Sequence, residues 1–359
     1  MHARIRTTAV TSLVAVSLLA GALPASADPV VSEPIAGGLV GPLGLAVGDD
    51  GTIYVGEAFS GQLTTIDEKG RTHTLVDQAG SEIAGLDATG KGTVVYTQTL
   101  FDGNAGEEAP PLDASLNGVR PNGTTRTIAS TMAYEEANNP DADAAYSFQG
   151  VDQACLDTIP PEFGIPPPYT GIVESHPYAV AIADDGWYVA DAAGNDVVHV
   201  DRRGRVSTVA VLPPVANLIT EEVLAGFGLP DCLLGATYYG EAVPTDVEIG
   251  PDGDLWVTSL PGGPELPGSG SVWRIDPATG DATMVAGGLS SAVDLAVADD
   301  GTVYVAELFE SRISIVADGS VTPFVEVPLP GAIDIGPDGT LYATILALTE
   351  DGAVVTITP

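Results

Sequence analysis

One short unit recurs along most of this chain and constrains its fold more than any other feature. Its clearest copy is the stretch 293–307, in which two runs of alternating apolar residues flank Asp299-Asp300-Gly301. Asp-Gly between alternating apolar residues predicts a β-hairpin, because glycine adopts the positive φ of the turn without a Cβ clash. Each copy therefore predicts two antiparallel strands joined by a tight acidic turn.

The unit occurs six times, and the other copies are 45–57, 83–96, 179–191, 246–257 and 332–343. A third and often a fourth apolar run follow, such as 312–316 and 206–212. Four antiparallel strands per repeat, about 40 residues apart where nothing is inserted, are typical of propeller blades. We therefore expect an all-β fold, a six-bladed β-propeller. A β-sandwich is the alternative, and the sixfold similarity counts against it.

The ends of the chain complement each other in this scheme. The last repeat has only three strand-like runs, and 30–35 precedes the first repeat without a blade of its own. We expect this N-terminal strand to complete the last blade and so close the ring. The domain organisation that follows is a signal peptide at 1–27 and a single propeller domain at 28–359, with insertions at about 132–175 and 213–243.

Residues 1–27 have the pattern of a secretory signal. Arg4 and Arg6 give a basic start, 8–23 is a short apolar core, and Ala25-Ser26-Ala27 is an A-x-A cleavage pattern. An uncleaved anchor is the alternative. The sequence has no second apolar span, so we expect a secreted, extracellular protein with no membrane span after signal removal, and a monomer.

The chain is strongly acidic, with a formal net charge of −37 that becomes −39 once Arg4 and Arg6 leave with the signal. Nucleic acids and anionic membranes are bound through basic patches, so this charge argues against both as partners. An unknown small molecule, glycan or protein remains as the expected partner. The acids are spread along the chain, which favours a solvated acidic surface, although cation binding is also compatible with it.

The two insertions follow fourth strands, so we expect both on the same face, where the central channel would open. Each carries one cysteine, Cys155 and Cys232, and a secreted chain with two cysteines usually pairs them. The bond would tie the two loops together over the channel mouth. Two free buried thiols are the alternative. A short helix is expected at 217–224, with Asn217 as its N-cap.

Candidate ligand residues end the second strands of several repeats. Glu57, Asp191 and Glu307 occupy this position, and together with Asp246 they could hold Ca²⁺, which prefers carboxylate and carbonyl oxygens. The alternative is that these acids cap turns. The first-strand acids form a second candidate ring, which comprises Asp87, Asp246, Asp294 and Asp334.

His176 is the weak candidate for a catalytic residue, because it precedes Pro177 where an insertion re-enters an inner strand. It could be a ligand or a general base, and a structural loop histidine is the alternative. No G-x-S-x-G elbow, H-E-x-x-H pair or phosphate-binding loop is present in the sequence.

Several motifs in order resemble the ScyD/ScyE family of secreted bacterial propeller-like proteins. They are the stretches 134–141 (Tyr-Glu-Glu-Ala-Asn-Asn-Pro-Asp), 176–179 (His-Pro-Tyr-Ala), 189–196 (Val-Ala-Asp-Ala-Ala-Gly-Asn-Asp) and 243–246 (Val-Pro-Thr-Asp). The resemblance covers the chain from about Gly37 to its end and implies fold and export rather than activity. The sequence departs from the family pattern at His176, where a polar Asn is expected, and in the insertions that carry the cysteines.

The absence of a recognisable catalytic set leads to the expectation of a secreted, non-enzymatic binding or scaffolding module. The alternative is a metal-dependent hydrolase or lactonase with a site at the mouth of the central channel, which rests on analogy at the level of the fold.

Overall fold

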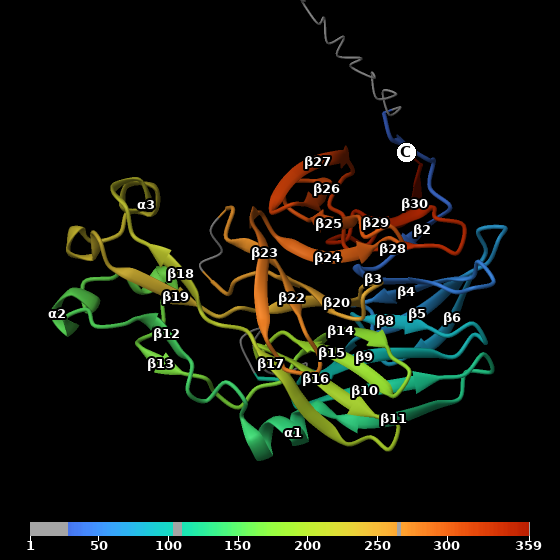
Figure 1. Cartoon of the computed structure of the whole chain (residues 1–359), viewed down its shortest axis with the longest axis horizontal. Helices are drawn as coiled ribbons and strands as arrows, with labels where there is room; N and C mark the ends of the chain where they lie inside the picture. Colours follow the sequence, from blue (N-terminus) through green and yellow to red (C-terminus); the bar gives the residue numbers. More distant parts are fainter. Residues whose placement is uncertain (1–27, 103–109, 264–266, 359) are drawn as a thin grey trace, which may run out of the picture.

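The computed structural model describes residues 28–102, 110–263 and 267–358 (Figure 1). The expected signal peptide at 1–27 lies outside these residues. Within them, strands form seven antiparallel sheets, and the only helices are short. The expected all-β fold is confirmed. No helix in this part of the chain is long and apolar enough to span a membrane.

The recurring unit folds as the sequence predicts. In its clearest copy, β24 (Ala292–Val297) pairs with β25 (Val303–Glu307), and Gly301 takes a φ of 86° in the turn between them. The turn is closed by the Ala298 N–H, which donates to the Thr302 carbonyl at 2.8 Å. The side chain of Asp300 accepts from the Thr302 N–H at 2.9 Å, which is the local bond that favours aspartate before glycine here. Strands β26 (Arg312–Ala317) and β27 (Ser320–Glu326) complete the sheet.

Three other sheets have the same four-strand order. They are β3 (Pro42–Val47), β4 (Ile53–Glu57), β5 (Gln62–Ile66) and β6 (Thr72–Asp77); β14 (Pro177–Ile182), β15 (Gly186–Asp191), β16 (Asp196–Asp201) and β17 (Val206–Val211); and β20 (Pro244–Ile249), β21 (Leu255–Ser259), β22 (Gly270–Ile275) and β23 (Ala282–Leu289).

The sheet of the second repeat has a divided inner edge. Its strands are β7 (Ser81–Glu82) and β8 (Leu86–Ala88), which both pair with β9 (Val94–Leu100), followed by β10 (Asp113–Val119) and β11 (Thr125–Ser130). The break between β7 and β8 explains why this copy is the weakest of the six in the sequence.

The N-terminal segment completes the last sheet, as expected. Strands β1 (Val30–Val31) and β2 (Ala36–Leu39) both pair with β30 (Gly352–Thr358), outside β29 (Leu341–Ile345) and β28 (Ile333–Ile335). Val30 lies opposite Thr358, and Ala36 lies opposite Val354. The first and last segments of the domain are therefore held by one set of backbone hydrogen bonds.

The core is divided among the spaces between consecutive sheets. Apolar clusters lie between each sheet and the next, and one cluster joins the last sheet to the first, with Ala332 and Val354 packed against Leu45, Val55 and Ile66. The inner strands touch in the same sequence, β3 to β8, β14, β20, β24, β28 and back to β3. Each sheet thus buries both of its faces against neighbours, which a single sheet cannot do alone.

The two insertions build a sheet of their own. The first contains α1 (Thr131–Asn138), β12 (Ala145–Phe148), α2 (Gln153–Leu156), η1 (Pro161–Phe163) and β13 (Tyr169–Thr170), and the second contains β18 (Val215–Leu218), α3 (Glu221–Phe227), η2 (Asp231–Leu233) and β19 (Thr237–Gly240). Strand β12 pairs with β19, so the two insertions share one sheet. In Figure 1 this sheet lies on the left, to one side of the inner strands rather than over them.

The expected helix of the second insertion lies further along the chain. Asn217 belongs to β18, and α3 begins after Thr220, whose side chain accepts from the Val223 N–H. The helix ends at Gly228, which has a φ of 68°. Threonine with acidic residues in the first turn and glycine at the end are better boundary signals than the expected Asn217.

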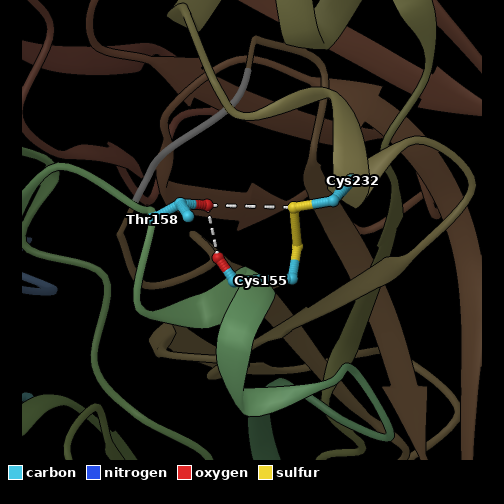
Figure 2. The surroundings of a disulfide bond; sticks show 3 residues. All are labelled: Cys155, Thr158 and Cys232. Carbon is cyan, nitrogen blue, oxygen red and sulfur yellow. Dashed lines mark hydrogen bonds between the residues drawn. A yellow bond between two sulfur atoms is a disulfide. The ribbon is translucent and has the colours of Figure 1, made fainter.

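The expected disulfide is present (Figure 2). Cys155 of α2 bonds to Cys232 of η2, across a sequence separation of 77 residues. Thr158 donates a hydrogen bond from Oγ1 to the Cys155 carbonyl at 2.6 Å and lies 3.8 Å from the Cys232 sulfur. Around the bond lies a separate small core, which includes Phe148, Leu233 and Tyr238.

Loss of this disulfide should loosen the inserted sheet. In the chain-entropy model a bond closing so long a loop contributes about 4 kcal/mol. The double variant Cys155→Ser, Cys232→Ser should therefore be cleaved within 132–175 or 213–243 by trace protease, at a rate at least tenfold above the parent. Thr158→Val keeps the disulfide and serves as the control. Equal cleavage rates in the parent and the double variant would contradict the structural role of the bond.

Candidate functional site

Acidic side chains line the space enclosed by the inner strands. Four aspartates each accept a hydrogen bond from a backbone N–H of the next inner strand, and they do so in the same sense around the axis. The acceptors and donors are Asp87 with Ile182 (2.8 Å), Asp246 with Leu295 (2.9 Å), Asp294 with Ile333 (2.8 Å) and Asp334 with Val47 (2.7 Å). These are the first-strand acids of the sequence analysis, and the structure brings them together.

Burial raises the pKa of every one of these carboxyl groups, and their mutual repulsion adds to the effect for most of them. The pKa of Asp87 rises to about 6, and those of Asp246 and Asp334 rise to about 7. The pKa values of Asp294 and Glu248 lie well above the usual range, because burial and the neighbouring carboxylates both favour the neutral acid. Protons or a bound cation must therefore balance this group near neutral pH.

A small cavity lies among these acids. It measures about 20 Å³, which is room for roughly one water molecule, and Tyr178, Asp246, Glu248 and Asp294 are among its lining residues. No lysine or arginine is among the residues that line it. Oxygen donors without a cationic partner are the chemistry that hard divalent cations such as Ca²⁺ prefer.

His176 lies where the chain enters β14, and its ring contacts Tyr178, which lines the cavity. Its Nε2 is 2.8 Å from Glu82 Oε1, and its ring meets those of Phe101 and Tyr178 edge-on, with 5.8 Å between centroids in each case. The backbone N–H of His176 donates to Asp191 Oδ1 at 2.6 Å. Both the ring and the backbone of this histidine are therefore fixed in position.

The charge environment of His176 suits a base. Burial lowers its pKa, but the carboxylates of Glu82 and Asp191 outweigh burial, and the net pKa is raised above the usual value. The pKa of Tyr178 is also raised, first by burial and then by Glu82, Asp294 and Asp246. Tyr178 thus links the His176–Glu82 pair electrostatically to the acids of the cavity.

The structure does not bring together the acids at the ends of the second strands. Glu57, Asp191 and Glu307 are each buried and each accept from the backbone N–H of the loop that leads into the inner strand of the same sheet. The donors are Val40 (2.7 Å), His176 (2.6 Å) and Ser290 (2.9 Å) respectively, and Glu307 also binds Arg312 through both oxygens. Asp246, by contrast, lies among the acids of the cavity. A ligand role for any of the four stays a prediction.

Two residues of this region were missed in the sequence. Glu82 lies in the weak second repeat, where no strand-end pattern marked it, and Tyr178 belongs to the regular repeat pattern of an inner strand. The adjacency of Tyr178 to His176-Pro177 was the available signal. Among the described residues, no three histidine, cysteine, aspartate or glutamate side chains stand in a ready-made metal-binding arrangement.

Comparison with known proteins places the fold. No protein-family model matches this chain, and no curated protein does. Among solved structures, a gluconolactonase of Xanthomonas campestris matches with a TM-score of 0.56 at 11% identity, over 93% of this chain and 96% of that one. The PQQ-bound aldose sugar dehydrogenase of Streptomyces coelicolor matches with a TM-score of 0.55 at 15% identity, over 94% and 99% of the two chains.

These similar structures are β-propellers, so the expected propeller class is confirmed. They are also named as enzymes, as is the soluble aldose sugar dehydrogenase of Escherichia coli, which matches with a TM-score of 0.55 at 11% identity over 92% and 99% of the two chains. The expectation of a non-enzymatic binding or scaffolding module is therefore wrong, and the hydrolase or lactonase alternative is better supported. At such identities the likeness shows the fold alone, so the activity itself is taken up below as a proposal.

The raised pKa of Asp246 predicts a measurable effect on stability. The folded protein holds a proton at Asp246 that the unfolded chain releases near pH 4, so the stability from this group is complete below about pH 4 and is lost as the pH rises toward 7. Asp246→Asn keeps an oxygen for the Leu295 N–H and does not titrate. In metal-free buffer, the stability of this variant relative to the parent should rise between pH 4 and 7 by on the order of 1 kcal/mol.

Denaturant unfolding at each pH, with the difference taken between variant and parent, measures this effect. Asp67→Asn is the control, because Arg71 lowers the pKa of the exposed Asp67 to about 2. The stability of Asp67→Asn relative to the parent should change only below about pH 4, and there it should fall as the pH rises. A pH-independent difference for Asp246→Asn would show that Asp246 ionises normally in the folded protein.

Proposed function

We propose that this protein is a metal-dependent hydrolase that opens lactones or related esters at the mouth of its central channel. The observation that carries the proposal is the His176–Glu82 pair, held at 2.8 Å and joined through the ring of Tyr178 to a cavity whose lining includes carboxylates but no lysine or arginine. The similarity of the fold to a gluconolactonase supports this choice among the chemistries that a propeller can host.

In this proposal, His176 is the general base. Glu82 accepts from the Nε2–H and so leaves Nδ1 as the basic nitrogen, for which no hydrogen bond is found among the described residues. His176 takes a proton from water as the oxygen attacks the ester carbonyl, and the same proton returns to the leaving alkoxide as the ring C–O bond breaks. Glu82 stabilises the imidazolium in between, which is the usual function of a carboxylate beside a catalytic histidine.

The acids of the cavity would hold the metal. Asp294 has one oxygen committed to the Ile333 N–H, which leaves its other oxygen available, whereas Asp246 accepts from the backbone N–H groups of Leu295 and Val247. A divalent cation such as Ca²⁺ would polarise the substrate carbonyl when bound. Phe101 and Tyr178, edge-on to His176, offer apolar surface against which a small substrate could rest.

The proposal extends to the architecture, family and location of the protein. We propose that the six sheets form a closed six-bladed ring, supported by the contact of β28 with β3 and by the apolar cluster that joins the last sheet to the first. We also propose membership in the ScyD/ScyE family, export through the segment 1–27, and a monomeric extracellular enzyme with a small-molecule substrate. The sequence patterns described at the outset support these assignments.

Hydrolysis of a lactone panel tests the proposed activity. Aldonic-acid γ- and δ-lactones and aryl esters would be incubated with the mature protein in the presence of Ca²⁺, Mn²⁺ or Zn²⁺, and acid release followed by pH-stat. His176→Ala should lower kcat/KM by roughly 100- to 10,000-fold and Glu82→Gln by less, as expected for a general base and its positioning partner.

His199→Ala is the matched control. His199 also pairs with a carboxylate, that of Asp185 at 3.2 Å, but it lies in the third strand of its sheet, β16, opposite Ser207 of β17. This control should keep full activity. Either no acid release with any substrate and metal, or full activity in His176→Ala, would refute the proposed function.

A further inference from the structure

A second group of buried acids lies outside the channel and contains oxygens without partners. Five buried side-chain polar atoms among the described residues have no hydrogen-bond partner, and three of them are Glu135 Oε1, Asn139 Oδ1 and Asp141 Oδ1. These three residues come from one stretch of seven. Buried acceptors without partners are costly, so three together indicate that something else supplies the positive charge they face.

The local fold directs these oxygens to one place. Helix α1 is capped at Ser130 and ends at Asn139, whose φ of 39° turns the chain back so that Pro140 and Asp141 follow at once. Asn139 donates from Nδ2 to the Gly171 carbonyl at 3.1 Å, and Asp141 Oδ1 lies against Gly171 where any side chain would collide with it. Glu135 is 2% exposed, and the Asp141 carboxylate contributes to its raised pKa. Asn139 and Asp141 therefore meet at Gly171, and the buried Glu135 lies close enough to Asp141 for their charges to interact.

Other buried carboxylates surround this place. Asp141 Oδ2 is held by the Tyr146 hydroxyl at 2.9 Å and by Asn195 Nδ2 at 3.0 Å, so only its Oδ1 is available. Asp191 and Asp196 flank Gly194, since a Cβ placed there would lie 3.3 Å from Asp191 Cγ and from Asp196 Oδ1. Burial first and the neighbouring acids second raise the pKa of Glu135 to about 8 and that of Asp196 well above its usual range.

Protonation alone does not satisfy this group. A proton on Glu135 would supply one hydroxyl donor, which could partner only one of the two free oxygens of Asn139 and Asp141 and would leave the other without a partner. The cationic influence recorded on these four acids is that of His176 on Asp191, and it lowers the pKa of that carboxyl without reversing the effect of burial. A divalent cation would instead partner all three free oxygens and reduce the repulsion among the four carboxylates.

We infer that Glu135, Asn139 and Asp141 bind a single Ca²⁺ ion behind His176, with Asp191 and Asp196 as neighbouring negative charges. Two carboxylates and an amide oxygen are hard donors of the mixed kind that Ca²⁺ accepts, with backbone carbonyls or water filling the remaining positions. The ion would join α1 to the turn between β15 and β16. These segments contain the two longest motifs of the family resemblance, 134–141 and 189–196, which lie far apart in the sequence.

The test of this site does not use hydrolysis. The protein purified without chelator should contain about one Ca²⁺ per chain by mass spectrometry of metals, counted in the Asp246→Asn background so that the channel does not contribute. Saturating Ca²⁺ should raise the melting temperature above that in EDTA by about 5 °C, as expected for a ligand at some 100 times its dissociation constant.

Glu135→Gln and Glu136→Gln form a matched pair. The two residues are adjacent on α1 and undergo the same chemical change, but Glu136 is exposed. Glu135→Gln should lose the bound Ca²⁺ and its thermal shift, while Glu136→Gln keeps both. If Glu135→Gln does not fold, Asn139→Gly removes the amide oxygen at a backbone conformation that glycine adopts without strain, and it should show the same loss.

Three outcomes would overturn the inference. One is a parent protein whose melting temperature does not respond to Ca²⁺, and another is a Glu135→Gln variant that responds as the parent does. The third is a Glu135→Gln variant as stable in EDTA as the parent is in Ca²⁺, because glutamine mimics a protonated glutamate and this result would identify Glu135 as a neutral acid.

Discussion

Hydrogen bonds that inner-strand aspartates accept from backbone N–H groups of the next inner strand are the interaction on which the arrangement of the sheets depends. Inner strands of neighbouring sheets do not pair with one another. The backbone N–H groups on the free edge of each inner strand therefore have no partner in a neighbouring strand. Asp87, Asp246, Asp294 and Asp334 each satisfy one such group across the gap. Apolar packing between the sheets is not directional, whereas these bonds fix how far one sheet slides against the next at four of the six junctions.

The same bonds concentrate negative charge on the axis. A carboxylate that accepts from a backbone N–H is stabilised as an anion, but burial and the nearby acids act in the opposite direction and prevail in the pKa values. An amide side chain could accept the same hydrogen bond at less electrostatic cost. Aspartate at these positions is therefore better explained by a task that needs the charge, such as holding a cation, than by the architecture alone.

The sequence predicted the parts of the fold that depend on local chemistry. Asp-Gly turns, alternating apolar residues and the unpaired N-terminal strand determined the hairpins and the completion of the last sheet. The sheet shared by the insertions could not be predicted in this way, because the pairing of Ser147 with Tyr239 depends on a contact between segments about 90 residues apart. Neither insertion shows the regular alternation of apolar and polar residues that would have revealed it.

The sites were harder to predict because strand position does not determine the direction of a side chain. Several inner strands begin with a bulge, for example between Pro244 and Asp246 and between Ala292 and Asp294, and a bulge re-aims the side chains beside it. Counting residues from the turn grouped Asp246 with Asp294, but it also placed Asp246 with Glu57, Asp191 and Glu307, from which the structure separates it. It did not show that Glu57 and Glu307 turn back to bind the loops of their own sheets.

Asp191 shows how the two acidic groups are related. Its carboxylate accepts from the His176 N–H and the Gly194 N–H, and also from the Ser175 hydroxyl at 2.5 Å, so it fixes the backbone of the histidine that borders the channel. It also contributes to the raised pKa values of Glu135 and Asp196 on its other side. Any change of charge among those acids therefore reaches His176 through one buried carboxylate. A cation beside Glu135 would favour ionised Asp191 and thereby the strong hydrogen bond from the His176 backbone N–H.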